Sequence, residues 1–342
     1  MQTPSSGQKE ETPLLNYLHS IHGKGATISL ETFIEAALYA PNIGYYTRSA
    51  QRVGYREGRD FYTAESLGSV FRRLLTASCL ELLGDDAKDY GFTELGAEPG
   101  EGLLANATHP FNTNTAFGCK EPFQIAGPQV LFSNELFDAQ PFRRFEFREG
   151  NWREHGVLLA DGGFEPTTRT EASSTAPPLP KSVPDGYILD DPSGARRLIE
   201  RIAEADWHGL FIAFDYGLDR ETLHQTRPSG TGRTYRDHRM GSDLLAHPGQ
   251  TDLTHHICWD DLSEALERDG FTSIKLQAQE SFFVHHGAKA MAEIIESGAQ
   301  KGLNRDLQTL KELLHPEHMG RKFQVLTAFR AKNTCQGSGN AR

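Results

Sequence analysis

The chain has 342 residues, of which 37% are hydrophobic and 24% are charged, so it can form one large α/β domain with insertions or two domains. Its 35 Lys and Arg residues against 46 Asp and Glu residues give a formal net charge of −11, which argues against a protein that grips nucleic-acid phosphates. It holds no apolar stretch of the ~18 residues needed to cross a membrane, and its start has no apolar signal segment, so we expect no membrane partner and a cytoplasmic location.

The first quarter of the chain is expected to be helical. Residues 1–27 are expected to form a polar tail and lead-in, and residues 28–90 a helical N-terminal region. Apolar residues recur at helical spacing after Ser29, a suitable N-cap, and this pattern ends before Pro41. A second amphipathic run over residues 67–83 ends at a glycine and predicts another helix.

Strands and helices then alternate, and this alternation predicts an α/β fold with a doubly wound sheet. Buried parallel strands are expected at 91–95, 129–133 and 210–214, and alternating strands at 271–276 and 323–329. The other expected elements are helices at 192–206 and 261–268, a hairpin at 142–157 that turns at Gly150-Asn151, and a flexible loop at about 161–185. Ligands of such sheets bind beyond the carboxyl ends of the strands, so functional residues are expected there.

A glycine-rich turn follows the first of these strands, with Glu94 at the strand end and then Gly96, Glu98 and Gly100. Such a turn lets backbone N–H groups approach a ligand closely, and the start of a following helix would add positive potential. A simple strand-to-helix turn explains the same pattern, so the motif alone is not specific.

An acidic segment, Asn134-Glu135-Leu-Phe-Asp138, follows the strand at 129–133. Glu135 and Asp138 are three residues apart, which on a helical turn places both carboxylates on one side. Two such carboxylates suit a guanidinium or amine substrate, because they bind its charge and orient a nitrogen. The alternatives are a solvated acidic loop, or Asn134 acting as a cap.

Asp215 and Tyr216 end the strand at 210–214, where a carboxylate would point into the crevice; a turn aspartate that binds the following backbone is the alternative. A long polar segment comes next, and long polar loops inside compact domains are more often functional than accidental. Its candidate substrate-binding residues are Arg233, Tyr235, His238, Asp252 and His255.

No metal site is expected. His255 and His256 are adjacent and would point to different sides, and no Cys or His completes a ligand set at a usable spacing. The four cysteines, Cys79, Cys119, Cys258 and Cys335, form no Cys-X-X-Cys pair, so neither a zinc ribbon nor a disulfide framework is expected.

Taken together, these segments resemble the MidA-like family over most of the chain, from about residue 28 to residue 329. The most specific segments are 39–46 (YAPNIGYY), 60–63 (DFYT), 134–141 (NELFDAQP), 215–217 (DYG), 233–238 (RTYRDH), 248–255 (PGQTDLTH) and 318–320 (HMG). The mitochondrial members of that family are arginine methyltransferases that assist the assembly of respiratory complex I.

The resemblance implies a Rossmann-like class I methyltransferase core, with S-adenosyl-L-methionine (SAM) as cofactor and a protein side chain as acceptor. This core would span residues 91–330, with a mostly parallel sheet, an antiparallel terminal strand, insertions at 158–187, 218–256 and 287–320, and a tail at 331–342. The implied cofactor-binding residues are Asp60, Thr63, Glu94, Gly96, Gly100, Glu121 and Asn134. Glu135, Asp138 and Asp215 would be catalytic, and Tyr216 would join the substrate-binding residues of the polar segment.

Two departures from the family pattern fall on the cofactor side. Glu98 stands where the family has the middle glycine of Gly-X-Gly-X-Gly, so Glu98→Gly should tighten SAM binding if the carboxylate obstructs the pocket. The interval from Gly102 to Val130 is shorter than in the family. Only residues 113–117 could form the second strand there, and Glu121 is the one nearby acidic candidate for the ribose hydroxyls.

Two functions are therefore compatible with the sequence. The first is an active SAM-dependent methyltransferase that modifies a protein side chain, with arginine as the favoured acceptor. The alternative is a catalytically silent relative that serves as a binding or assembly factor. The apolar helical segment Ala288–Ile295 could form the interface of a homodimer.

Overall fold

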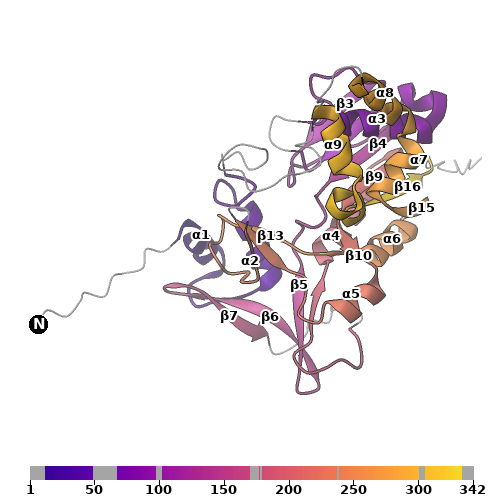
Figure 1. The fold of residues 1–342 in the computed structure, drawn as a ribbon. Coiled ribbons are helices and arrows are strands. Elements are labelled where there is room, and N and C mark those ends of the chain that lie inside the picture. The colour runs from indigo at the N-terminus through magenta and orange to yellow at the C-terminus, as the bar shows by residue number, and fades with distance from the viewer. Residues whose placement is uncertain are drawn as a thin grey trace, which may run out of the picture.

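A six-stranded sheet forms the centre of the larger part of the protein (Figure 1). The computed structural model describes residues 12–48, 68–97, 102–169, 177, 179–236, 239–299 and 305–332. The strand order is β15-β16-β9-β4-β2-β3, with bounds β2 Gly91–Leu95, β3 Thr113–Phe117, β4 Gly127–Asn134, β9 Trp207–Asp215, β15 Phe271–Ala278 and β16 Gln324–Arg330. The pairings β3-β2, β2-β4 and β4-β9 are parallel, whereas β16 is antiparallel to β9 and β15.

Both faces of this sheet are covered, which explains why its central strands are almost continuously apolar. Successive side chains point to opposite faces. Phe132 and Phe214 therefore enter one cluster with helices α3 (Ser69–Leu83), α7 (Gln279–His286), α8 (Ala288–Ala299) and α9 (Arg305–Leu314). Leu131 and Phe211 enter the other, with α4 (Ser193–Glu204) and α6 (Trp259–Arg268).

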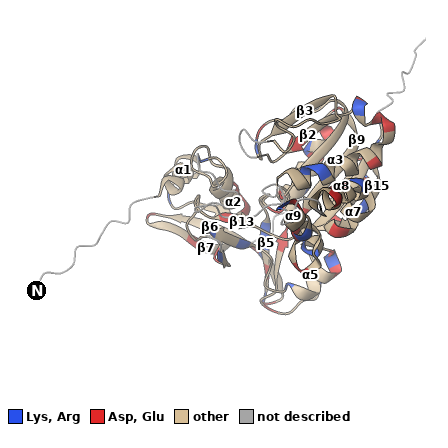
Figure 2. Cartoon of the chain, turned by 45° about the horizontal axis from the view of Figure 1, so that its top comes forward, with Lys and Arg blue, Asp and Glu red and all other residues tan. Residues whose placement is uncertain are grey.

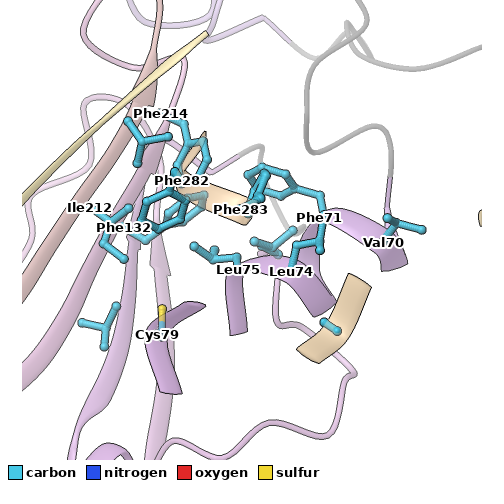
Figure 3. Close-up of a cluster of buried hydrophobic side chains, with 14 of the residues drawn as sticks. Val70, Phe71, Leu74, Leu75, Cys79, Phe132, Ile212, Phe214, Phe282 and Phe283 are labelled. Carbon is cyan, nitrogen blue, oxygen red and sulfur yellow. The ribbon is translucent and has the colours of Figure 1, made fainter. Parts of the chain in front are cut away.

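Aromatic rings fill the first cluster, which Figure 3 shows in close-up. Phe71 of α3 lies between the sheet and α7, with its ring centroid 5.2 Å from that of Phe214 and 5.8 Å from that of Phe283. Ala290 and Ile294 of α8 are buried in the same cluster, although Ile295 is 50% exposed. Most of the apolar face of the segment Ala288–Ile295 is thus used for packing within the chain.

A second sheet lies beside the first, with α1 (Pro13–His22) and α2 (Leu30–Tyr39) against it (Figure 1). Its strands are β1 Thr27–Ser29, β5 Arg143–Arg148, β6 Asn151–Ala160, β7 Gly163–Arg169 and β8 Ile188–Asp191. The predicted hairpin is confirmed, since β5 and β6 are antiparallel, but it turns at Glu149-Gly150, one residue earlier than predicted. The predicted N-cap is also confirmed, because the Thr32 N–H donates to Ser29 Oγ at 3.0 Å.

One helix in this region was not predicted, and one local prediction is wrong. Residues 13–22 form helix α1, which begins at Pro13 with Thr12 as its N-cap and buries Leu14, Leu15 and Leu18. The expected loop after residue 160 begins instead with strand β7, which extends the sheet antiparallel to β6. Its side chains are mostly exposed, so the polar sequence of an edge strand looks like that of a loop.

The polar segment after β9 folds over the carboxyl ends of the central strands. It contains the short pair β10 (Gly217–Leu218) and β14 (Ile257–Cys258), helix α5 (Arg220–Thr226), and a three-stranded sheet of β12 (Arg239–Gly241), β11 (Arg233–Arg236) and β13 (Asp252–Thr254). The short helical turns η2 (Gly84–Asp89) and η3 (Pro316–Gly320) lie elsewhere in the chain. None of the helices in the described ranges is both long and apolar enough to cross a membrane.

The connection from β2 to β3 contains turns in place of the helix that was expected to follow the glycine-rich turn. In its described part, residues 102–112 form no helix. The Leu103 N–H donates to Glu94 Oε2 at 2.6 Å, so this buried carboxylate holds the turn in place. Residues 113–117 form strand β3 beside β2, as predicted.

Candidate active site

A cavity of about 850 Å³ opens at the carboxyl ends of the parallel strands. Its β2–β3 end is lined by Gly96, Ala97, Gly118, Cys119, Lys120 and Glu121. Its β4–β9 end is lined by Glu135, Asp138, Tyr216, Arg233, Tyr235, Asp252, Thr254 and His256. Asn134 lies between the two ends, and three tyrosines at and after the end of α2 form a further wall.

The β2–β3 end is shaped by backbone contacts around Gly96. This residue has a φ of +89°, and a Cβ atom there would lie 3.0 Å from Leu136 Cδ1, so a glycine is required. The Gly96 N–H donates to Phe117 O at 2.8 Å, which ties the end of β2 to the end of β3. The exposed Glu121 lines the cavity, and its carboxylate accepts a hydrogen bond from the Gly118 N–H at 3.0 Å.

Asn134, at the end of β4, has a polar atom that no protein group satisfies. Its Nδ2 donates to Glu135 Oε1 at 3.2 Å, but its buried Oδ1 has no hydrogen-bond partner among the described residues. Buried polar atoms are rarely left unpaired, so an unpaired one that faces a cavity indicates a ligand. The carbonyl oxygen of Asn134 is therefore a candidate acceptor for an amino or hydroxyl group.

The segment after β4 is held by Asp215 at the end of β9. Asp215 Oδ2 accepts hydrogen bonds from the backbone N–H groups of Phe137 at 2.9 Å and Asp138 at 3.3 Å. Its Oδ1 accepts from the Tyr216 N–H at 2.8 Å. Burial, and then the nearby charge of Asp138, raise the pKa of Asp215 well above its usual value. Asp215 is fully buried and does not line the cavity, so it positions Asp138 and cannot itself contact a ligand.

Asp138 presents a carboxylate to the cavity although its side chain is only 3% exposed. The Tyr216 hydroxyl donates a short hydrogen bond to Asp138 Oδ2, whereas Oδ1 has no partner in the part of the chain that the structure describes. Burial raises the pKa of Asp138 to about 6, against the opposing effects of the Tyr216 hydrogen bond and the Arg233 charge. One oxygen is thus fixed and the other is available to a ligand proton.

Arg233 sits over two aromatic rings at the same end. Its guanidinium carbon is 4.7 Å from the ring centroid of Tyr216 and 5.5 Å from that of Tyr235, and its Nε donates to Thr254 Oγ1 at 3.4 Å. These contacts keep the cation against the wall. The middle of this end of the cavity is therefore acidic, because it is lined by Glu135, Asp138 and Asp252.

The two adjacent histidines differ in position. His255 is fully buried, packs against Phe142 with its ring tilted by 49°, and does not line the cavity, which corrects its predicted substrate-binding role. His256 lines the cavity instead. Burial lowers the pKa of His255 to about 4, and burial followed by the charge of Arg233 lowers the pKa of His256 to about 3. Both imidazoles are therefore neutral at pH 7.

Three tyrosines form one wall of the cavity, and no role for them was predicted. Tyr39 and Tyr46 stack with ring centroids 5.6 Å apart, and Tyr45 packs edge-on against Tyr46. The Tyr39 hydroxyl donates to Ala139 O at 2.8 Å, and Lys120 Nζ lies 4.5 Å from its ring centroid. The closely spaced aromatic residues in 39–46 are the signal that could have indicated a binding wall.

Most of the predicted site residues meet at this cavity. Those that line it are Gly96, Glu121, Asn134, Glu135, Asp138, Tyr216, Arg233, Tyr235 and Asp252. Those that do not are Glu94, which holds the turn after β2, Asp215, which holds the segment after β4, and His255. Asp60, Thr63, Gly100, His238 and the departure at Glu98 lie outside the described residues. In the described ranges, no three His, Cys, Asp or Glu side chains are grouped as metal ligands.

Comparison with known proteins gives consistent matches. Residues 86–277 match the family model described as "Putative S-adenosyl-L-methionine-dependent methyltransferase". The chain is 23% identical over 378 aligned residues to the mitochondrial protein arginine methyltransferase NDUFAF7 of Danio rerio, an alignment that covers 90% of this chain and 85% of that protein.

Two solved structures from Burkholderia thailandensis have the same fold. One is a COG1565 superfamily member bound to S-adenosyl-homocysteine, with a TM-score of 0.81 and 24% identity, covering 97% of this chain and 96% of the other. The second, an uncharacterized COG1565 superfamily protein, has a TM-score of 0.75 and 22% identity, covering 97% and 95%. The predicted α/β methyltransferase-like fold is thereby confirmed.

Proposed function

The chain belongs to this family of S-adenosyl-L-methionine-dependent methyltransferases, and we propose that it methylates a nitrogen of a protein side chain, with an arginine guanidinium as the acceptor. The observation that carries the proposal is the buried Asp138, which lines the cavity and whose Oδ1 has no hydrogen-bond partner in the described residues. The family membership favours this enzyme over the alternative of a silent binding factor.

The β2–β3 end of the cavity fits the cofactor. It has the glycine turn that lets backbone approach a ligand, an acidic residue past the second parallel strand, and the unpaired Oδ1 of Asn134. We assign Gly96 and Ala97 to close backbone contact, Glu121 to the ribose hydroxyls, and Asn134 to the amino-acid part. These assignments fit the proposal that the sheet is a Rossmann-like class I core, in which ligands bind past the strand ends. When bound, SAM supplies an electrophilic methyl group on a sulfonium.

The β4–β9 end fits a cationic acceptor. Asp138 Oδ1 would accept a hydrogen bond from the guanidinium and turn one nitrogen toward the cofactor end. Tyr216, which donates to Oδ2, keeps the carboxylate from rotating. Glu135 and Asp252 add negative charge, and Arg233 stays against the tyrosine rings.

Asp138 is also the proposed acceptor of the proton that the reaction releases. A nitrogen that gains a methyl group must give up one proton, and Oδ1 is the group that would receive it before it passes to solvent. Burial raises the pKa of Asp138 to about 6, so at pH 7.5 it is ionised but closer to the range of an effective base than an exposed carboxylate.

Isotopic methyl transfer tests the proposal. The full chain is incubated with methyl-labelled SAM and short peptides that differ only in one residue, Arg, Lys or His. Label in methylarginine alone is expected. Label in lysine or histidine would overturn the choice of arginine, and a calorimetric titration that shows no SAM binding at millimolar concentration would overturn the cofactor site.

A further inference from the structure

A second cavity of about 990 Å³ lies beside the first, between α9 and the turn η3. We call it the α9 groove. It is lined by Arg305, Gln308, Thr309, Lys311, Glu312, His315, His318, Met319, Lys322 and Phe323. The cofactor and acceptor assignments above use none of the residues on α9.

The α9 groove adjoins the active-site cavity. Lys322 and Phe323 line both cavities, so these two residues form the boundary between them. The ring of Phe323 packs edge-on against that of Tyr216, with centroids 5.9 Å apart, and Tyr216 donates to Asp138. A chain that leaves the β4–β9 end over Phe323 therefore enters the α9 groove.

The α9 groove is basic on a protein whose net charge is −11. Figure 2 shows acidic and basic residues mixed over the helices that cover the sheet. The residues that line the groove include three cations, Arg305, Lys311 and Lys322, but one carboxylate, Glu312. Glu312 Oε2 is 2.6 Å from His318 Nδ1. Lys311 and Lys322 are exposed and make no ion pair with any described residue. This leaves two cations available to a partner.

We propose that the α9 groove binds an acidic segment of the protein substrate, adjacent in sequence to the residue that is methylated. The inference rests on the proposed function, because the methyl acceptor must sit at the β4–β9 end for its neighbours to reach the groove. Clustered positive charge next to an active site raises the association rate of an acidic chain and selects its orientation. Because the lysines are exposed, salt weakens this attraction.

Fluorescence anisotropy with the full chain tests the groove by binding. The probes are two labelled peptides, each with one arginine followed by four glutamates or by four glutamines. We expect about tenfold tighter binding of the glutamate peptide at low salt, and loss of this preference in Lys311→Glu/Lys322→Glu. The matched control, Lys88→Glu/Lys181→Glu, carries the same charge change at exposed positions outside both cavities and should keep the preference.

The milder Lys311→Gln provides a second measurement, because it touches only the α9 groove. In methyl-transfer assays it should raise KM for the glutamate peptide about threefold with kcat unchanged. Equal binding of the two peptides, an unchanged preference in Lys311→Glu/Lys322→Glu, or tight binding of a ten-nucleotide oligodeoxythymidylate in place of the glutamate peptide would each overturn the inference.

The two proposals fail in different ways. If both peptides are methylated equally well, the docking inference is wrong and the proposed function stands. If the glutamate peptide binds in the lysine-dependent manner but neither peptide is ever methylated, the acidic docking surface stands, and the arginine acceptor is wrong.

Discussion

At the β4–β9 end of the cavity the ligand-facing carboxylate is buried and fixed by other protein groups, whereas at the β2–β3 end the ligand-facing groups are partly exposed and belong to turns. Asp138 is held through its backbone by Asp215 and through its side chain by Tyr216. Glu121, in contrast, is exposed and is held by one hydrogen bond from Gly118.

The β4–β9 end is therefore suited to a reaction that needs fixed groups, and the β2–β3 end to a ligand that is bound by groups that can adjust. A reacting nitrogen must be placed within a few tenths of an ångström, so the groups that orient it need a rigid surround. A nucleoside can be held by several weaker contacts that adjust on binding. Substitutions at the β4–β9 end should therefore reduce the methyl-transfer rate, and those at the β2–β3 end should reduce cofactor affinity.

Asp138→Asn should have the largest effect. The amide keeps the shape of the carboxylate but removes its negative charge and its ability to take a proton, so kcat should fall by about 10²–10⁴-fold. SAM affinity, measured by calorimetric titration, should change less than threefold. Asp161→Asn, at an exposed turn outside the cavity, is the control and should keep full activity. A variant Asp138→Asn that turns over at the normal rate would remove Asp138 from the mechanism.

Asp215→Ala tests how rigidly the same end is held. It leaves three backbone N–H groups without their acceptor, the buried ones of Phe137 and Asp138 and the partly buried one of Tyr216. At about 1–3 kcal/mol for each unsatisfied group, the free energy of unfolding should fall by about 3–9 kcal/mol. Denaturant unfolding measures this change.

The comparison for this variant is Asp219→Ala, which removes the exposed N-cap of α5. A cap of this kind is worth about 1 kcal/mol. Equal losses from Asp215→Ala and Asp219→Ala would show that the segment after β4 does not depend on the buried carboxylate.

Gly96→Ala probes the β2–β3 end. The backbone φ of +89° is unfavourable for alanine, and the added Cβ would lie 3.0 Å from Leu136 Cδ1. The turn must therefore shift away from the position that contacts the cofactor. SAM affinity should fall about tenfold, and stability by about 1–2 kcal/mol. Gly84→Ala shares the positive φ, at +64°, but has open space around it and lies outside the cavity. It should cost stability without loss of SAM affinity; an equal loss of affinity would attribute the effect to general destabilisation.

The sequence predicted the central sheet and the β4–β9 end well. Strands β4 and β9 are continuous apolar runs bounded by polar residues, and Asp138 and Tyr216 follow them directly, so periodicity and the rule for strand ends located both. The resemblance of residues 134–141 and 215–217 to the MidA-like family then indicated which family to expect.

The sequence could not assign individual roles where neighbours differ only in burial. His255 and His256 are adjacent, and only the three-dimensional packing shows that the first points to Phe142 and the second to the cavity. Glu94 lies at the end of the expected strand, where a cofactor ligand was predicted. Its carboxylate instead accepts a hydrogen bond from the Leu103 N–H across the turn. Lys311 lies in none of the motifs, and only the fold brings it into one groove with Lys322 and Phe323.

The pH dependence of the rate gives the smallest expected effect and the finest test of the β4–β9 end. Protonated Asp138 has lost the charge that attracts the guanidinium and cannot take the released proton, so kcat/KM should fall as the pH drops through about 6, the raised pKa of Asp138. Tyr216→Phe removes a hydrogen bond that stabilises the ionised carboxylate and lowers this pKa. The acidic limb should therefore move to higher pH, by about one unit or less. Tyr235→Phe, which alters a neighbouring tyrosine of the same cavity, should leave the limb in place. A limb that persists unchanged in Asp138→Asn, or that moves to lower pH in Tyr216→Phe, would assign it to another group, because only a carboxylate stabilised by Tyr216 can shift in the stated direction.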